Sequence, residues 1–92
     1  MKIRVEYVAQ IRDAAGCPNE GLDLPAGSAV QDAVRAVARA RGGRLATMLL
    51  DAAGNLNPSA LLFVGDEQVG WTDVRPLRDG DTVTLMSPLA GG

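Results

Sequence analysis

The residues with the clearest capacity for chemistry stand at the end of the chain, which reads Met86-Ser87-Pro88-Leu89-Ala90-Gly91-Gly92. Pro88 has no amide N–H and favours an extended conformation at the residue before it, so a strand that reaches this segment ends there. Glycine at the last two positions adds no Cβ atom, which leaves the terminal carboxylate open to approach from every side. These residue types predict a flexible arm, over about residues 88–92, that presents one carboxylate.

The composition of this arm fits insertion into a partner. No charged residue follows Asp81, so the arm can enter a narrow apolar channel without desolvating a charged side chain. A frayed end or a cloning remnant would also leave two glycines, but their position just after a predicted strand favours a functional arm. We predict that Gly92 carries the reactive carboxylate and that Gly91 provides clearance. The residues predicted to contact a partner are Met86, Pro88, Leu89 and Ala90.

Length and composition predict one globular domain over residues 1–92, because 92 residues form one hydrophobic core but not two. No apolar stretch approaches the ~20 residues of a membrane span. The N-terminal sequence alternates charged with apolar residues and lacks the apolar block of a secretory signal. We therefore expect a soluble, cytoplasmic protein with no membrane partner.

Missing residue types exclude several classes of function. The chain has no histidine, which excludes histidine-based nucleophile pairs and histidine-ligated metals. Its single cysteine, Cys17, can form neither an internal disulfide nor an iron–sulfur cluster. The net charge of −2 disfavours binding to nucleic acid. We predict a protein that is not an enzyme on its own and holds no metal or cofactor.

A local basic cluster falls on one predicted helical region and comprises Arg35, Arg39, Arg41 and Arg44. Cations are favourable near the negative C-terminal end of a helix, so a solvated helix face is the main interpretation. The alternative is a docking patch for an acidic partner.

The elements that must position the arm begin with two strands. Residues 2–8 alternate polar with apolar side chains, and residues 20–24 place Leu22 and Leu24 on one face, which predicts an edge strand paired with the first in a hairpin. Between them, residues 10–16 predict a short helical or turn-like connection that Gly16 ends.

A main helix is predicted over about residues 29–41, with Ser28 as its N-cap and Gln31 completing a capping box. Its apolar stripe comprises Val30, Ala33, Val34 and Val37. Residues 44–50 predict one or two further helical turns, and Gly42-Gly43 separates the two segments.

Three more strands follow. The continuous apolar run of residues 60–64 predicts a central strand covered on both faces, with Phe63 in the core. Residues 67–69 and 82–86 predict a short strand and a last strand, the latter preceded by an Asp79-Gly80-Asp81 turn. This order predicts an α+β fold, the β-grasp (ubiquitin-like) roll: a mixed sheet, one main helix packed across it, and the first and last strands side by side.

The sequence resembles the MoaD/ThiS family of ubiquitin-like sulfur carriers over its whole length. The resemblance lies in Arg4–Gly16 (RVEYVAQIRDAAG), in the L-R-D-G-D-x-V-x-L block of residues 77–85, and in the S-P-L-A-G-G ending. Length and the R-D-A-A-G segment are most similar to the small, sulfur-carrier subunit of molybdopterin synthase.

The resemblance implies a defined chemistry for the arm. An E1-like adenylyltransferase would join the Gly92 carboxylate to AMP from ATP, and sulfur from a donor would then replace AMP to give a C-terminal thiocarboxylate. The implied acceptor is the large subunit of molybdopterin synthase, in molybdenum cofactor biosynthesis. ATP and the sulfur donor would act through the activating partner, since the chain carries no nucleotide-binding glycine motif.

Three alternatives stay open at this point. The same thiocarboxylate chemistry could serve the synthesis of cysteine, thiamine or a secondary metabolite. The chain could instead be a ubiquitin-like modifier whose Gly92 is joined to lysines, or a β-grasp interaction module whose arm is incidental.

Overall fold

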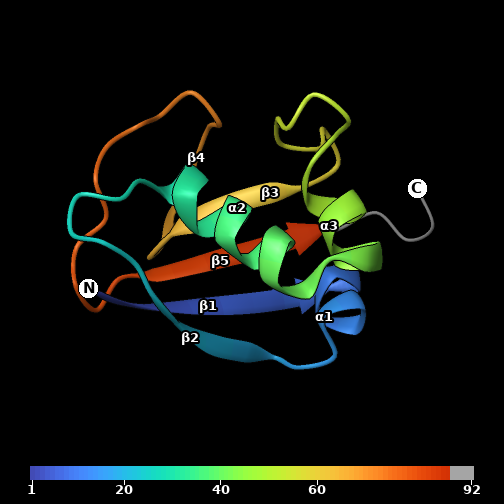
Figure 1. The fold of residues 1–92 in the computed structure, drawn as a ribbon, viewed down its shortest axis with the longest axis horizontal. Coiled ribbons are helices and arrows are strands. Elements are labelled where there is room, and N and C mark those ends of the chain that lie inside the picture. The colour runs from blue at the N-terminus through green and yellow to red at the C-terminus, as the bar shows by residue number, and fades with distance from the viewer. Residues whose placement is uncertain (88–92) are drawn as a thin grey trace.

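Five strands form one mixed sheet and three helices lie against it in the computed structural model, which describes residues 1–87 (Figure 1). In chain order the elements are β1 (Lys2–Ala9), α1 (Gln10–Ala15), β2 (Asn19–Asp23), α2 (Val30–Arg41), α3 (Gly43–Leu49), β3 (Leu61–Val64), β4 (Glu67–Val69) and β5 (Thr82–Ser87). The sheet order is β2-β1-β5-β3-β4. The predicted mixed sheet with one main helix across it is confirmed.

The first and last strands are the central pair of the sheet. β1 runs parallel to β5, with Val5 opposite Val83 and Tyr7 opposite Leu85. β5 also pairs with β3 on its other side, in antiparallel register. The strand that leads into the C-terminal residues therefore has a neighbour on both sides, as the element order predicts.

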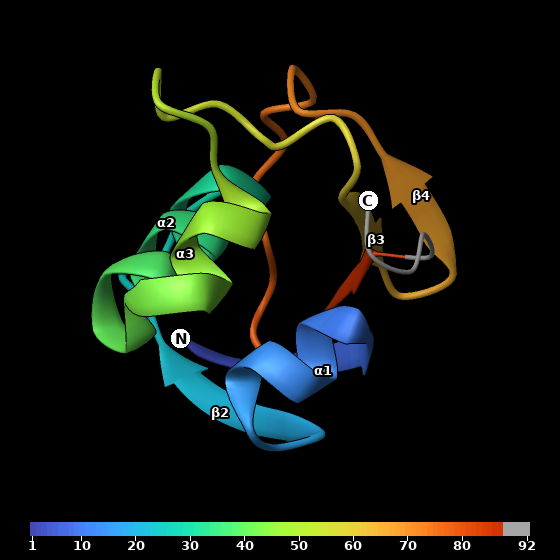
Figure 2. The ribbon, with the colours of Figure 1, turned by 90° about the vertical axis from the view of Figure 1, so that its right-hand side faces the viewer.

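One face of the sheet is buried beneath the helices. Figure 2 shows α2 and α3 together on one side of the curved sheet. The buried apolar side chains that fill this side include Ile3, Val5, Tyr7, Ala33, Val34, Val37, Leu45, Leu49, Leu62, Val83 and Leu85. The predicted helix stripe and the alternation of β1 are confirmed, since burial of these apolar surfaces is the main favourable term in folding.

The start of α2 differs from the prediction. Ala29, not Ser28, is the N-cap, and its N–H donates to a carboxylate oxygen of Asp32 at 2.9 Å. The Ser28 hydroxyl instead donates to the carbonyl of Pro25 at 2.8 Å. Gln31 takes no part in a capping box, because its side chain is buried under the loop that follows β4. The predicted Ser28–Gln31 capping box is wrong.

The prediction for β3 is also corrected. Leu62 is buried, but Leu61 and Phe63 are only half-buried because no helix covers the second face of the sheet. Phe63 is therefore not a core residue, and β3 is covered on one face rather than on two.

The remaining elements follow the predicted pattern. β1 and β2 are antiparallel, although their connection contains α1, which ends at Gly16 with a positive φ of 79°. Helix α3, strand β4 and the turn at Gly80 (φ 88°) lie where the sequence predicts them. Among residues 1–87, no helix combines the length and the apolar character that crossing a membrane requires.

Candidate functional site

Met86 is the part of the predicted site that the structure describes. It lies near the end of β5, opposite Val8 of β1 and Leu61 of β3. Ser87 follows as the last residue of the strand and is 5% exposed. The other predicted site residues, Pro88, Leu89, Ala90, Gly91 and Gly92, lie outside the described residues. The structure therefore places the base of the predicted arm at the centre of the sheet.

Met86 belongs to a group of apolar side chains on the face that no helix covers. We call this group the open-face patch, and it comprises Val8, Leu61, Phe63 and Met86, all half-buried. The β-ladder register places Val8, Met86 and Leu61 in one row across three strands. Phe63 lies in the next row, opposite Thr84.

The chemistry of the open-face patch suits recognition and not catalysis. None of its four side chains titrates, and the nearest carboxylate in the strand register, Glu6, pairs with Arg4 at 3.2 Å. Methionine adapts its shape to a partner surface more readily than branched side chains do. Three members of the patch were missed by sequence reasoning, although the period-two alternation of β1 and β3 is the signal that finds them.

The backbone beside the end of β5 is strained. Ala9, opposite Ser87, has a φ of 58° and a ψ of −131°, and it is the only non-glycine residue with positive φ between residues 1 and 87. Such conformations cost about 1–3 kcal/mol and persist where the surrounding structure imposes them. Here the strain turns the chain from β1 directly into α1, which packs against β1 and β5.

A polar cluster lies at the other side of β1. The Tyr7 hydroxyl donates to Glu20 of β2, and Arg41 of α2 donates to the same carboxylate oxygen at 2.5 Å. Arg41 also donates to the carbonyl of Ala15 at 2.9 Å and to the Cys17 sulfur at 3.3 Å. Arg41 is thus a structural link between α2 and β2, not part of a purely solvated face as predicted.

The ionisation of this cluster follows from its burial and its hydrogen bonds. Burial, reinforced by the hydrogen bond to Glu20, raises the pKa of Tyr7, so the phenol stays protonated. Burial opposes ionisation of Glu20, but the hydrogen bonds from Tyr7 and Arg41 outweigh it and lower the pKa of that carboxyl.

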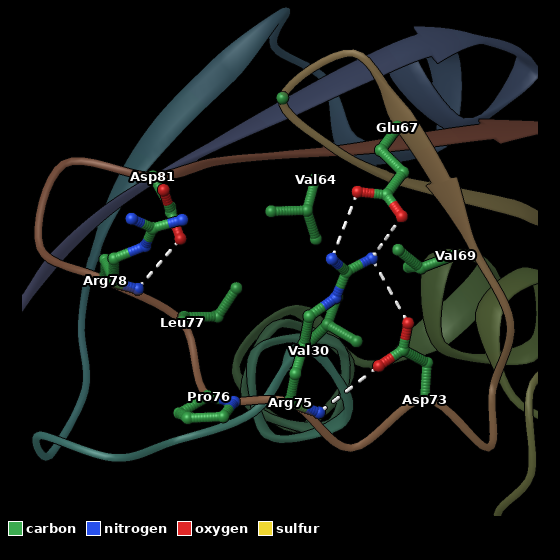
Figure 3. Close-up of a pocket in the computed structure, with 11 residues that line it drawn as sticks. Val30, Val64, Glu67, Val69, Asp73, Arg75, Pro76, Leu77, Arg78 and Asp81 are labelled. Carbon is green, nitrogen blue, oxygen red and sulfur yellow. Dashed lines mark hydrogen bonds and ion pairs between the residues drawn. The ribbon is translucent and has the colours of Figure 1, made fainter.

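A hollow of about 260 Å³ lies at the opposite end of β5 from Met86 (Figure 3). Its apolar wall comprises Val30, Val64, Val69 and Leu77. At its mouth Arg75 forms ion pairs with Glu67 at 2.7 Å and with Asp73 at 3.1 Å. These pairs tie the loop after β4 to the sheet edge.

Comparison with known proteins identifies the family of this chain. A model of the family described as "ThiS family" matches residues 5–92. The chain belongs to the ThiS family. The predicted membership of this family of ubiquitin-like sulfur carriers is confirmed, and with it the prediction that the chain is not an enzyme on its own.

Individual relatives agree with this assignment. The chain is 27% identical to the molybdopterin synthase sulfur carrier subunit of Chlamydomonas reinhardtii, over the full length of both. The crystal structure of SAMP1 from Haloferax volcanii superposes with a TM-score of 0.88 at 21% identity, covering 100% of both chains. A chain of the BexX/CysO complex from Amycolatopsis orientalis gives 0.68 at 23% identity, covering 98% of this chain and 99% of that one. The β-grasp, ubiquitin-like fold is thereby confirmed.

Proposed function

We propose that this chain carries sulfur as a thiocarboxylate on Gly92 and donates it in molybdopterin synthesis. The observation that carries the proposal is the family match over residues 5–92, which includes the terminal Gly91-Gly92. In the proposed cycle an E1-like adenylyltransferase joins the Gly92 carboxylate to AMP from ATP. The outer sulfur of a persulfide then attacks the acyl carbon, AMP leaves, and an acyl disulfide with the sulfur donor forms. A thiol reductant attacks the donor's sulfur in that disulfide, which releases the thiocarboxylate and leaves the thiol and the donor joined as a disulfide.

In this cycle the partner activates the carboxylate and the carrier presents it, which fits the described residues. A free carboxylate is a poor electrophile, so its activation needs a nucleotide and a catalytic site, both of which the partner would supply. The carrier has to present one end and to be recognised. The anchored strand β5 supports presentation, and the open-face patch next to it offers an apolar surface of the kind found at the centre of interfaces.

The proposed acceptor is the large subunit of molybdopterin synthase. Support comes from the Chlamydomonas reinhardtii carrier subunit, whose similarity extends over the whole of both chains. An acceptor in cysteine, thiamine or secondary-metabolite synthesis would use the same thiocarboxylate and differ only in the partner. Reconstitution with each class of acceptor enzyme distinguishes them by which one consumes the thiocarboxylate.

Mass spectrometry tests the carrier chemistry. Incubated with its E1-like enzyme, ATP and a sulfur source, the chain is expected to gain the mass difference between sulfur and oxygen. Omission of ATP is the control and should leave the mass unchanged. Lysine-linked adducts with other proteins, formed without any thiocarboxylate, would replace the carrier by a protein modifier.

A further inference from the structure

The free edge of the sheet at β2 presents backbone groups that no described residue pairs. The N–H of Leu24 donates to the carbonyl of Met1, and the carbonyl of Pro18 accepts from the N–H of Tyr7. Backbone groups alternate in direction along a strand, so those of Glu20 and Leu22 also point toward β1. The N–H and C=O groups of Gly21 and Asp23 therefore point outward, and Figure 1 shows β2 as the sheet's open lower edge.

Gly21 marks the middle of this exposed edge. It is exposed, sits in the middle of β2, and a Cβ atom added there would meet no other atom within 4 Å. Natural edge strands are often blocked by proline, by a bulge or by a covering segment. None of these devices occurs in β2 itself.

A groove begins at the residue after β2 and extends to the main helix. It measures about 340 Å³ and lies between the segment after β2, with Leu24 and Pro25, and the face of α2 that carries Arg35, Ala36 and Arg39. Its apolar part is formed by Leu24 and Ala36, and arginines stand along the helix side.

The lining of the groove carries an excess of one positive charge, since Arg35 and Arg39 stand against one carboxylate, Asp32. Within residues 1–87, neither Arg35 nor Arg39 forms an ion pair, although Arg35 stacks over Trp71 at 5.2 Å. The acids nearby are already engaged. Asp32 accepts from the N–H of Ala29, and Asp23 pairs with Lys2 at 3.1 Å. Carboxylates from a partner would thus meet arginines that lack acidic partners.

We propose that β2 and this groove bind an extended, acidic peptide segment of a partner protein, which adds to the sheet as a sixth strand. Backbone hydrogen bonds to Gly21 and Asp23 would give affinity, and Arg35 and Arg39 would select acidic side chains. This surface lies on the helix-covered side of an edge strand, so it is separate from the open-face patch.

Two pairs of substitutions separate the contribution of the backbone hydrogen bonds from that of the groove charge. Gly21→Pro removes the outward N–H, while Gly21→Ala keeps it and fits the free space, so the pair differs in one hydrogen-bond donor. Arg39→Glu reverses one groove charge on an exposed helix position, and Arg39→Lys retains it. If Gly21→Pro impairs folding, as judged by its NMR spectrum, the Arg39 pair still tests the proposal.

The probe is a short, end-blocked peptide with a valine-rich centre flanked by glutamates, titrated into the full chain and followed by amide NMR. We expect shifts centred on Gly21 and Asp23, slower hydrogen exchange of the Gly21 amide, and affinity that falls with added salt. Gly21→Pro and Arg39→Glu should each weaken binding by about tenfold, while Gly21→Ala and Arg39→Lys should stay within about threefold.

Three results would overturn the proposal. The first is the absence of shifts at β2. The second is equal binding of a matched peptide in which lysines replace the glutamates. The third is concentration-dependent protection of Gly21 without peptide, which would mean that a second copy of the chain occupies this edge.

Discussion

The two faces of the sheet use the same strands for different purposes. In β5, Leu85 on the helix-covered face is 1% exposed, whereas Met86, the next residue, stays half-exposed on the open face. Helices pack on the covered face, and burial of its apolar side chains stabilises the fold. The open face keeps apolar surface available near the end of β5. Stability and recognition are thus assigned to alternate residues of one strand, so single substitutions can separate them.

The largest expected effect is on the covered face. Val34 is fully buried in α2, and Val34→Asp would place an unpaired charge in the core. We expect the free energy of unfolding to fall by about 3–5 kcal/mol, measured by urea denaturation. Ala40→Asp, on an exposed position of the same helix, is the control and should cost less than about 1 kcal/mol. Equal unfolding curves for Val34→Asp and the parent would mean that the buried face of α2 is misassigned.

Substitutions in the arm should reduce thiocarboxylate formation and leave the stability of the fold unchanged. Deleting Gly92 withdraws the reacting carbonyl by about 3.3 Å, well beyond the ~0.5 Å tolerance of a productive site. Thiocarboxylate formation should fall by at least about 100-fold. Gly91→Val should act in the same direction, because it adds branched bulk next to the reacting end.

Neither arm variant alters the core, so both should keep the parental melting temperature within about 2 °C. Near-normal thiocarboxylate formation by the Gly92 deletion would leave an interaction module as the better description of the chain. A large drop in melting temperature would instead show that the last residues contribute to the fold.

The open-face patch should respond in binding and not in stability. Met86→Asp puts a charge into the proposed apolar interface, and we expect affinity for the E1-like enzyme or the acceptor to fall by about tenfold, measured by calorimetry. Ala40→Asp, at an exposed position of α2 on the helix-covered side of the sheet, adds the same charge away from the patch and should bind normally. Equal losses in the two variants would point to net charge rather than to the patch.

The alternation of residues in strands and the apolar stripe of the helix predict, from the sequence alone, most of the side chains that lie on the covered face. The alternation in β1 identifies Ile3, Val5 and Tyr7 as buried, and the helix stripe identifies the buried side of α2. These patterns work because burial is decided by side-chain direction, which regular secondary structure fixes.

The wrong predictions concern residues whose burial depends on segments that are distant in the sequence. Gln31 is drawn into the interior by the carbonyls of Trp71 and Asp73, which accept from its amide at 2.6 and 2.7 Å and lie about 40 residues away in sequence. No local capping rule contains that information. For Phe63, an apolar run shows that a strand is buried but not whether a second layer covers its other face. The strained backbone at Ala9 could not be predicted, because an alanine in the sequence does not indicate a positive φ.

The smallest expected effect concerns the polar cluster of Tyr7, Glu20 and Arg41, which lies at the edge of the covered face. Glu20 accepts from Tyr7 and Arg41, with its side chain 27% exposed. Glu20→Gln removes the charge and keeps the shape, and at neutral pH we expect the free energy of unfolding to fall by about 1 kcal/mol. Glu67→Gln, in an exposed pair with Arg75, is the matched control and should leave the melting temperature unchanged.

The pH dependence identifies the cause of that loss. The folded-state pKa of Glu20 lies below its ordinary value of 4.5, so its charge stabilises the fold above pH 4.5 and this contribution is lost as the pH falls through the lower, folded-state pKa. The glutamine side chain does not titrate. The difference in unfolding free energy between parent and Glu20→Gln should therefore shrink as the pH falls below 4.5, when both are compared by urea denaturation. A difference that stays constant into strong acid would mean that packing of the side chain, and not its charge, holds β2 to α2.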